Sequence, residues 1–222
     1  MSLAIFDLDN TLLNGDSDHA WGEFICEQGI VDPQRYRETN DRFYRQYQDG
    51  SLDILEFLKF ALEPLSRHSP RQLAQWHDLF MRQKVAPMMQ PGALRLLDAH
   101  RARGDFLLII TATNRFVTAP IARRLGVDAL LATDPAMEAG RYTGQVEGIP
   151  CFREGKVVRL QQWLQKTGQD LAGSHFYSDS HNDLPLLELV EHPVAVDPDE
   201  PLRHTAVERG WPVISLRDSQ AT

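Results

Sequence analysis

Short apolar segments that end in polar residues constrain this chain more than any other feature. Three of them stand far apart in the sequence: LAIFDL at residues 3–8, FLLII at 106–110 and HFYS at 175–178. Two shorter ones follow at residues 194–196 and 213–216. Short apolar runs of this kind are typical of strands that are buried on both faces. Because helix-like sequence separates them, the pattern predicts an α/β fold with a parallel sheet.

Between these segments, apolar side chains recur at the spacing of amphipathic helices. The spacing predicts helices over Ala93–Arg103, Val117–Leu125 and Lys156–Thr167. Gly104 and Gly126 directly follow the first two and can end them in a left-handed conformation. Helices that alternate with strands in this way predict a three-layer, Rossmann-like core.

Residues 16–87 differ, because they contain no strand-like segment. Instead, three stretches place apolar or aromatic side chains on one helical face, and Asp-Pro, Asp-Gly and Ser-Pro pairs punctuate them. The first stretch, from Tyr36 to Tyr47, is rich in aromatic residues, which we interpret as core rather than as a ligand-binding surface. We therefore expect an all-helical insertion at residues 16–87 and a core formed by residues 1–15 and 88–222.

The amino-acid composition limits which binding partners and which cellular compartment are expected. The formal net charge is -8, so the chain repels phosphate backbones and nucleic acid is not an expected partner. Any phosphate site must therefore carry local positive charge. No apolar stretch approaches the ~20 residues that cross a bilayer, and the N-terminus lacks the basic segment of a secretory signal. Cys26 and Cys151 are far apart in sequence and are expected to be reduced thiols of a cytoplasmic protein.

Polar residues at the strand ends carry the chemistry. Ligands of open α/β sheets bind outside the carboxyl ends of the strands. Asp7 and Asp9 close the first strand and, two residues apart, point to the same side. Two close carboxylates repel each other unless a cation lies between them or one of them holds a proton. The pair therefore indicates a Mg²⁺ site, a proton donor beside a nucleophile, or both.

Other strand ends add to this pair. Thr111 follows the second strand, Asp179 and Asp183 follow the third, and Lys156 begins the helix before the third. Taken singly, Asp183 could cap a helix and Lys156 could be a solvated charge. Taken together, they supply the nucleophile, acid, hydroxyl donor, cation and metal ligands that an aspartyl-phosphate enzyme needs.

These residues resemble the four motifs of the haloacid dehalogenase-like hydrolase superfamily. The motifs are matched by DLDNT at 7–11, by Thr111 after FLLII, by Lys156 after Gly155, and by SDSHND at 178–183. The match extends over nearly the whole chain, and the insertion resembles a helical cap of the C1 type. Residues 125–148 are similar to the matching part of phosphoserine phosphatases. The resemblance therefore implies the phosphoserine phosphatase-like branch, which also contains histidinol-phosphate phosphatases.

The resemblance implies a role for each residue. Asp7 attacks phosphorus, and Asp9 protonates the leaving alkoxide and then activates water. The implied metal site comprises Asp7, Asp9 through its main-chain carbonyl, Asp179 and Asp183, and the implied phosphate site comprises Thr111, Lys156 and Asn182. The implied protein is a Mg²⁺-dependent phosphatase that hydrolyses a small phosphorylated metabolite through a phosphoaspartyl intermediate.

Three related activities stay open at this level. A receiver domain of a response regulator also has a phosphoacceptor Asp, but its acidic pair precedes the strand that carries the acceptor. A dehalogenase needs the nucleophile but neither a metal nor an acid two residues further on. A phosphotransferase uses the same residues as a phosphatase and passes the phosphoryl group to an alcohol.

Two features bear on the substrate. Residues 111–114 are Thr-Ala-Thr-Asn where phosphoserine phosphatases have Ser-Gly-Gly, which argues against phosphoserine. Asp16 aligns with the acidic residue that meets the substrate's amino group in those enzymes, although Asp16 or Asp18 could instead cap the first inserted helix. If Asp16 meets the substrate, the substrate carries an amine or imidazolium. Histidinol phosphate then fits slightly better than phosphoserine, whose carboxylate would need a cation such as Arg115 or Arg42.

Overall fold

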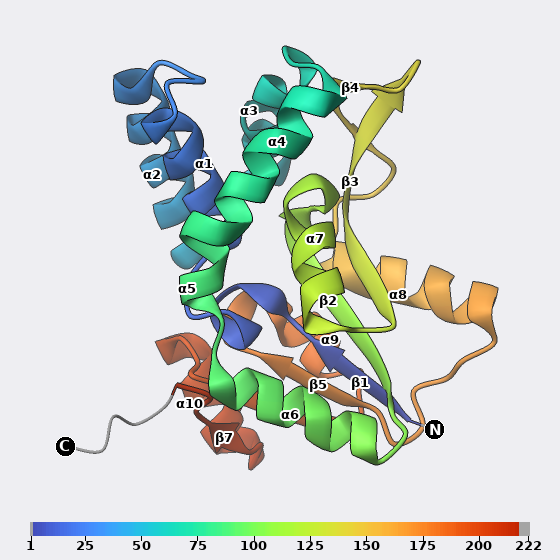
Figure 1. Cartoon of the computed structure of the whole chain (residues 1–222). Coiled ribbons are helices and arrows are strands. Elements are labelled where there is room, and N and C mark those ends of the chain that lie inside the picture. Colours follow the sequence, from blue (N-terminus) through green and yellow to red (C-terminus); the bar gives the residue numbers. More distant parts are fainter. Residues whose placement is uncertain (1, 218–222) are drawn as a thin grey trace.

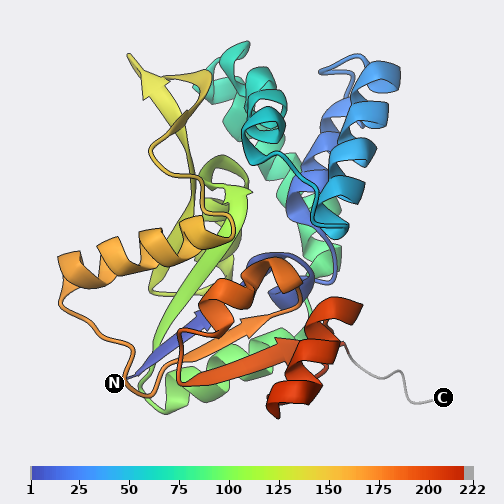
Figure 2. The same cartoon turned by 180° about the vertical axis from the view of Figure 1, so that it is seen from behind.

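A seven-stranded sheet forms the centre of the molecule (Figures 1 and 2). The computed structural model describes residues 2–217, and within them the strand order is β4-β3-β2-β1-β5-β6-β7. All pairings are parallel except that of β4 with β3 at one edge. The strands are β1 (Leu3–Phe6), β2 (Phe106–Asn114), β3 (Ala129–Glu138), β4 (Arg141–Glu147), β5 (His175–Ser178), β6 (His192–Val196) and β7 (Val213–Ile214). The predicted α/β fold is confirmed.

The central strand β1 is buried on both faces of the sheet. Leu3 and Ile5 pack into one apolar cluster, and Ala4 and Phe6 pack into another. Successive side chains of a strand point to opposite faces, so a strand with a core on each side must be apolar throughout. This is why the sequence of β1 is a continuous apolar run.

Helices cover both faces of the sheet (Figures 1 and 2). Leu97 of α6 and Val117 of α7 join the cluster of Phe6, and Leu160 of α8 joins that of Ile5. The helices of the core are α6 (Pro91–Ala102), α7 (Arg115–Leu125), α8 (Glu154–Thr167), α9 (Leu184–Leu187) and α10 (Glu200–Arg209). The first three begin two residues before their predicted starts, within the usual uncertainty of helix ends.

The inserted helices lie beyond the carboxyl ends of the strands (Figure 1). They are α1 (Ser17–Glu27), α2 (Pro33–Gln48), α3 (Ile54–Ser66), α4 (Pro70–Phe80) and α5 (Ala86–Met88). The first four begin at capping side chains, which are Asp16, Asp32, Asp53 and Ser69. The exact limits of the two domains, at residues 15 and 88, stay a prediction.

The β3–β4 hairpin was not predicted. Most residues of β4 are exposed or half-buried, so its sequence, RYTGQVE, contains no apolar run. The hairpin nevertheless supports the insertion, because α3 lies against it: a Cβ atom at Gly144 would lie 3.4 Å from the Ser66 side chain. The edge strand β4 therefore packs against the inserted helices through α3.

Two expectations from composition can be compared with this structure. Cys26 and Cys151 are both buried and unpaired. None of the helices within residues 2–217 combines the length and apolar character needed to cross a membrane.

Candidate active site

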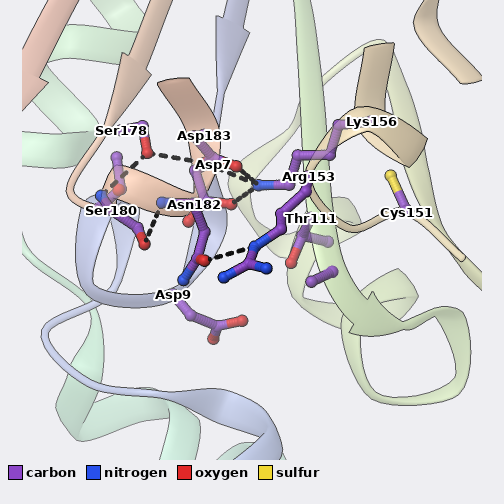
Figure 3. Close-up of polar contacts among 12 residues, drawn as sticks. Asp7, Asp9, Thr111, Cys151, Arg153, Lys156, Ser178, Ser180, Asn182 and Asp183 are labelled. Atoms are coloured by element: carbon purple, nitrogen blue, oxygen red, sulfur yellow. Dashed lines mark hydrogen bonds and ion pairs between the residues drawn. The ribbon is translucent and has the colours of Figure 1, made fainter. Parts of the chain in front are cut away.

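The predicted residues lie close together at the carboxyl ends of β1, β2 and β5 (Figure 3). Asp7 directly follows β1, and its N–H donates to the carbonyl of Tyr177 in β5 at 2.9 Å. The chain then makes a tight turn in which Asn10 has φ of 57°, and this turn leads towards α1. The other predicted residues are Thr111 in β2, Lys156 in the first turn of α8, Asp179 after β5, and Asn182 and Asp183 in the turn before α9.

Lys156 lies between two carboxylates at the centre of this group. Its Nζ donates to Oδ1 of Asp7 at 2.7 Å and to Oδ2 of Asp183 at 2.8 Å. Ser178 donates a further hydrogen bond to Asp183 at 2.7 Å. Lys156 is only 2% exposed, so it is not a solvated helix charge. Its charge is the local positive charge that the acidic chain was expected to carry at the predicted phosphate site.

Burial and mutual repulsion raise the pKa values of the site carboxylates. Burial raises the pKa of Asp7 to about 7, opposed by Lys156 and reinforced by Asp183 and Asp9. The pKa of Asp179 also lies well above its ordinary value, because of burial and then because of Asp7. Burial alone would lower the pKa of Lys156, but its ion pairs with Asp183 and Asp7 outweigh this and raise it. The cluster therefore has a strong tendency to take up a proton or a cation.

Asp9 bridges the core and the insertion. Its Oδ1 accepts from the N–H of Ser17 in α1 at 2.6 Å, and its Oδ2 accepts from the hydroxyl of Thr113 in β2 at 2.8 Å. Burial, and then the charge of Asp16, raise the pKa of Asp9 to about 6. A carboxyl group with that pKa can hold a proton near neutral pH and donate it, as a general acid must.

The donor atoms of the predicted metal site are oxygens, which are the type of ligand that Mg²⁺ binds. Asp179 is oriented by Thr11, whose hydroxyl donates to its Oδ1 at 2.9 Å and accepts from its N–H at 3.1 Å. No three His, Cys, Asp or Glu side chains within residues 2–217 are placed to hold a metal on their own. The predicted set is different, because it joins the carboxylates of Asp7 and Asp179 to a main-chain carbonyl of Asp9. Mg²⁺ is commonly bound by one or two carboxylates and several waters.

Asp183 and Asn182 face other partners in this structure. The carboxylate of Asp183 accepts hydrogen bonds from Lys156 and Ser178. The amide of Asn182 accepts from Nε of Arg153 at 2.9 Å and donates to the carbonyl of Tyr47 in α2 at 3.1 Å. Their roles in the metal shell and in phosphate binding stay predictions.

A cavity opens beside Asp7 between the sheet and the inserted helices. Its lining residues are Asp7, Asp9, Asp16, Asp18, His19, Asn40, Phe43, Tyr44, Tyr47, Leu52, Ile54, Phe57, Thr111, Ala112, Thr113 and Phe152. The interpretation of the α2 aromatic residues as core alone is wrong for part of the stripe. Phe43 packs with Leu52 and Phe152 in a small apolar cluster, but it also lines the cavity, as do Tyr44 and Tyr47. Because α2 lies over the strand ends, its inner face covers a cavity rather than only a packed core.

Asp16 and Asp18 differ in how they are bonded. Oδ1 of Asp16 accepts from the N–H groups of Asp18 and His19 at 2.9 and 2.8 Å, so Asp16 caps α1. Oδ1 of Asp18 accepts a long hydrogen bond of 3.4 Å from Asn114. Both carboxylates also line the cavity, so helix capping and ligand contact are compatible at this position.

Several residues that shape the site were not predicted from the sequence. Thr113 and Ser17 hold Asp9, and Arg153 connects Asn182 to the insertion. The polar run from Thr111 to Asn114 was a usable signal for Thr113, because it follows a strand directly. Nothing in the local sequence marks Arg153, because its partners are distant in the chain.

The chain belongs to the haloacid dehalogenase-like hydrolase family, whose pattern matches residues 4–188. It is 46% identical over 220 residues to a histidinol-phosphatase of Neisseria meningitidis serogroup C (strain 8013), covering 97% of this chain and 99% of that protein. It is 31% identical over 227 residues to a probable phosphatase of Mycobacterium tuberculosis, covering 96% of this chain and 75% of that protein. Both of these relatives are named as phosphatases.

Solved structures agree with this assignment of the fold. A protein of unknown function from Bordetella pertussis Tohama I is 49% identical and superposes with a TM-score of 0.92, over 97% of this chain and 98% of that one. A substrate-bound phosphoserine phosphatase is 17% identical with a TM-score of 0.71, over 97% and 93% of the two chains. At 17% identity, the similarity to phosphoserine phosphatase shows only that the two chains share a fold.

The buried lysine gives a first testable prediction. Lys156→Met leaves Asp7 and Asp183 buried without their cation, so we expect a loss of about 3–5 kcal/mol in the free energy of unfolding, measured by denaturant titration. Lys166→Met, at an exposed position of the same helix, should change it by less than about 0.5 kcal/mol. Equal stability of Lys156→Met and wild type would contradict the geometry described for this ion pair.

Proposed function

We propose that this chain hydrolyses a small, positively charged phosphomonoester, with histidinol phosphate as the substrate that fits best, through a phosphoaspartyl intermediate on Asp7. The observation that carries the proposal is a cavity that Asp16 and Asp18 line together with Asp7, whose carboxylate is bonded to the buried Lys156. An anionic phosphate can lie near Lys156, and a positively charged group of the same substrate can lie near Asp16 and Asp18. The relative named histidinol-phosphatase supports the same substrate.

The chemistry assigns each proton and bond to a residue. A carboxylate oxygen of Asp7 attacks phosphorus, and the bond from phosphorus to the substrate oxygen breaks. Asp9 gives its proton to that oxygen and then takes one from the water that attacks the phosphoaspartate, which releases phosphate and restores Asp7. Lys156, with Thr111 nearby, neutralises charge on the phosphoryl oxygens. Mg²⁺ bound by Asp7, Asp179 and the main-chain carbonyl of Asp9 would supply further positive charge to the phosphoryl group.

The cavity lacks a partner for a substrate carboxylate. None of the described residues that line it is Lys or Arg. Both arginines considered for that role are engaged elsewhere: Arg115 pairs with Asp134, and Arg42 stacks on the ring of Phe43 and lines a separate groove. Phosphoserine would therefore leave its carboxylate unpaired beside Asp16, at a cost of the order of 1–3 kcal/mol or more.

The same cavity offers partners for an amine and an imidazole. Asp16 and Asp18 can accept from ammonium or imidazolium N–H groups, and charge-assisted hydrogen bonds of this kind are the strong ones. Aromatic side chains of Phe43, Tyr44 and Phe57 supply flat apolar walls on which an imidazole ring can stack. Histidinol phosphate carries both nitrogen groups and no carboxylate. It can therefore bond the two carboxylates and stack on the aromatic side chains without leaving a carboxylate unpaired.

Metal dependence can be measured through its coupling to pH. Asp7 and Asp9 have pKa values of about 7 and 6 in the folded protein and ~3.9 when unfolded. Because the folded state holds these protons more tightly, they stabilise it below about pH 4, and this stabilisation is lost as pH rises towards 7. A bound cation replaces the protons, so we expect the Mg²⁺-induced rise in Tm, relative to EDTA, to be larger at pH 7.5 than at pH 5.

Buried histidines also titrate in this pH range, but they contribute equally to Tm with Mg²⁺ and with EDTA. Subtracting the two Tm values at each pH therefore removes their contribution. Asp7→Asn should greatly reduce the rise in Tm. Full activity after exhaustive chelation, or a rise in Tm that does not depend on pH, would contradict the metal site.

The assignment of Asp9 as the acid predicts a dependence on the leaving group. Asp9→Asn should lower kcat for an alkyl phosphate by ~10²–10⁴-fold, because an alkoxide needs a proton to leave. An aryl phosphate has a good leaving group, so its loss should be much smaller. Steady-state kinetics on both substrates measure the difference, and equal losses would argue against Asp9 as the proton donor.

The substrate assignment is tested by comparing charged and neutral phosphates. We expect wild type to have a higher kcat/KM for histidinol phosphate than for phosphoserine. Asp16→Asn and Asp18→Asn should each lower kcat/KM for histidinol phosphate by about 1–3 kcal/mol and affect a neutral aryl phosphate little. Asn caps a helix about as well as Asp, so Asp16→Asn removes the charge and keeps the cap.

The exposed Asp98→Asn on α6 is the control and should change neither substrate. Preference of wild type for phosphoserine would overturn the proposed substrate. Equal effects of Asp16→Asn and Asp18→Asn on both phosphates would leave these residues with a structural role only.

A further inference from the structure

The C-terminal end of α2 is bonded to the core by a continuous chain of three hydrogen bonds. Nη2 of Arg153 donates to the carbonyl of Gly50 at 2.6 Å, and Nε of the same guanidinium donates to Oδ1 of Asn182 at 2.9 Å. The other end of the Asn182 amide donates to the carbonyl of Tyr47 at 3.1 Å. Figure 3 shows Arg153 reaching from the start of α8 towards Asn182. Two core side chains therefore hold one end of an inserted helix.

Helix ends explain why these donors bind there. The last carbonyls of an α-helix have no partner within the helix, and the helix C-terminus carries partial negative charge. Asn182 bonds the carbonyl of Tyr47 in the last turn of α2, and the guanidinium of Arg153 bonds the carbonyl of Gly50, two residues beyond the helix. The positive charge of Arg153 is therefore placed where the helix dipole attracts it.

The backbone of Arg153 is held in a costly conformation. Its φ and ψ are 50° and -122°, which a residue with a side chain rarely adopts and which persists only where the surroundings enforce it. Its guanidinium lies over the ring of Phe152, 5.0 Å from the centroid. On the other side, Gly50 approaches so closely that a Cβ atom would lie 3.0 Å from Nε2 of His181 and 3.1 Å from Nη2 of Arg153.

The bonded chain joins the two halves of the cavity. Tyr47 and Phe152 both line it, one from α2 and the other from the core. Asn182 lies in the turn between Asp179 and Asp183, and Arg153 lies one turn before Lys156. The position of the aromatic wall on α2 is therefore fixed relative to the phosphate-binding end by these contacts.

We propose that Arg153 is a positioning residue for substrate selection, which closes α2 over the cavity and holds its aromatic wall against the organic part of the substrate. This inference rests on the proposed function only for the choice of substrate. A phosphomonoester whose organic group contacts the wall of α2 depends on the contact. A small aryl phosphate, which needs only the phosphate end and a good leaving group, depends on it much less.

The kinetic test uses Arg153→Ala with two substrates. We expect kcat/KM for histidinol phosphate to fall by about 10- to 100-fold, mainly through KM, as fits the loss of hydrogen bonds from a charged group. The value for an aryl phosphate should change by less than about threefold. Arg45→Ala removes an exposed positive charge from the last turn of α2 and should leave both values of kcat/KM unchanged.

A second variant separates positioning from stability. Arg153→Gly removes the side chain and also relieves the positive φ, so it should unfold at a higher denaturant concentration than Arg153→Ala. It should nevertheless show the same loss of selectivity. Recovery of wild-type selectivity in Arg153→Gly would mean that Arg153→Ala acts through destabilisation, which would overturn the proposal.

Hydrogen exchange tests the contact without any substrate. Backbone amides at residues 45–51 should exchange faster in Arg153→Ala than in wild type or Arg45→Ala. Unchanged exchange, or equal kinetic losses on both phosphates, would overturn the role of Arg153. A wild type with no preference for histidinol phosphate would instead overturn the proposed substrate, and the exchange experiment would still decide the inference.

Discussion

The rest of the site depends on the buried ion pairs of Lys156. A lysine that is 2% exposed can stay charged only because Asp7 and Asp183 flank it at 2.7–2.8 Å. The arrangement needs β1 and the turn before α9 to end at the same edge of the sheet as the first turn of α8, which a parallel sheet with crossover helices provides. Desolvation makes such a group expensive, and good geometry with further hydrogen bonds, such as that of Ser178, offsets the cost. The strand ends that the fold brings together are therefore the same ones that form the predicted phosphate site.

Much of the fold could be predicted because burial on two faces leaves a strong signal. β1 is a continuous apolar run, since each of its side chains meets a core. β4 carries no such signal, because it is half-exposed and lies at the sheet edge. The aromatic face of α2 was assigned to the core because periodicity shows only that a helix face is covered. It does not show whether other side chains or a cavity cover that face.

The candidate site was predictable where residue type and strand end coincide, as at Asp7, Thr111 and Asp179. It was not predictable where the partner is a main-chain atom far away in sequence. Arg153 bonds the carbonyl of Gly50, and a carbonyl is present at every residue, so no sequence pattern can mark it. The roles of Asp16 and Asp18 required geometry as well, because a helix cap and a ligand contact use the same residue types.

The electrostatics of the cavity connect these parts to selectivity. A chain with a net charge of -8 disfavours anions in general, and Lys156 beside Asp7 is the cation on which the proposed phosphate site relies. Under the proposed function, the carboxylates of Asp16 and Asp18 would act in two ways. They would attract an ammonium or imidazolium, and they would repel metabolites that carry a carboxylate beside their phosphate. Selectivity that includes repulsion needs the repelling groups held at a fixed distance from the phosphate end. Ser17 bonds α1 to Asp9, and Arg153 bonds the segment after α2 to the core through Gly50. Under the proposed function, discrimination would therefore depend on how firmly the insertion is bonded to the core, and not only on which charges line the cavity.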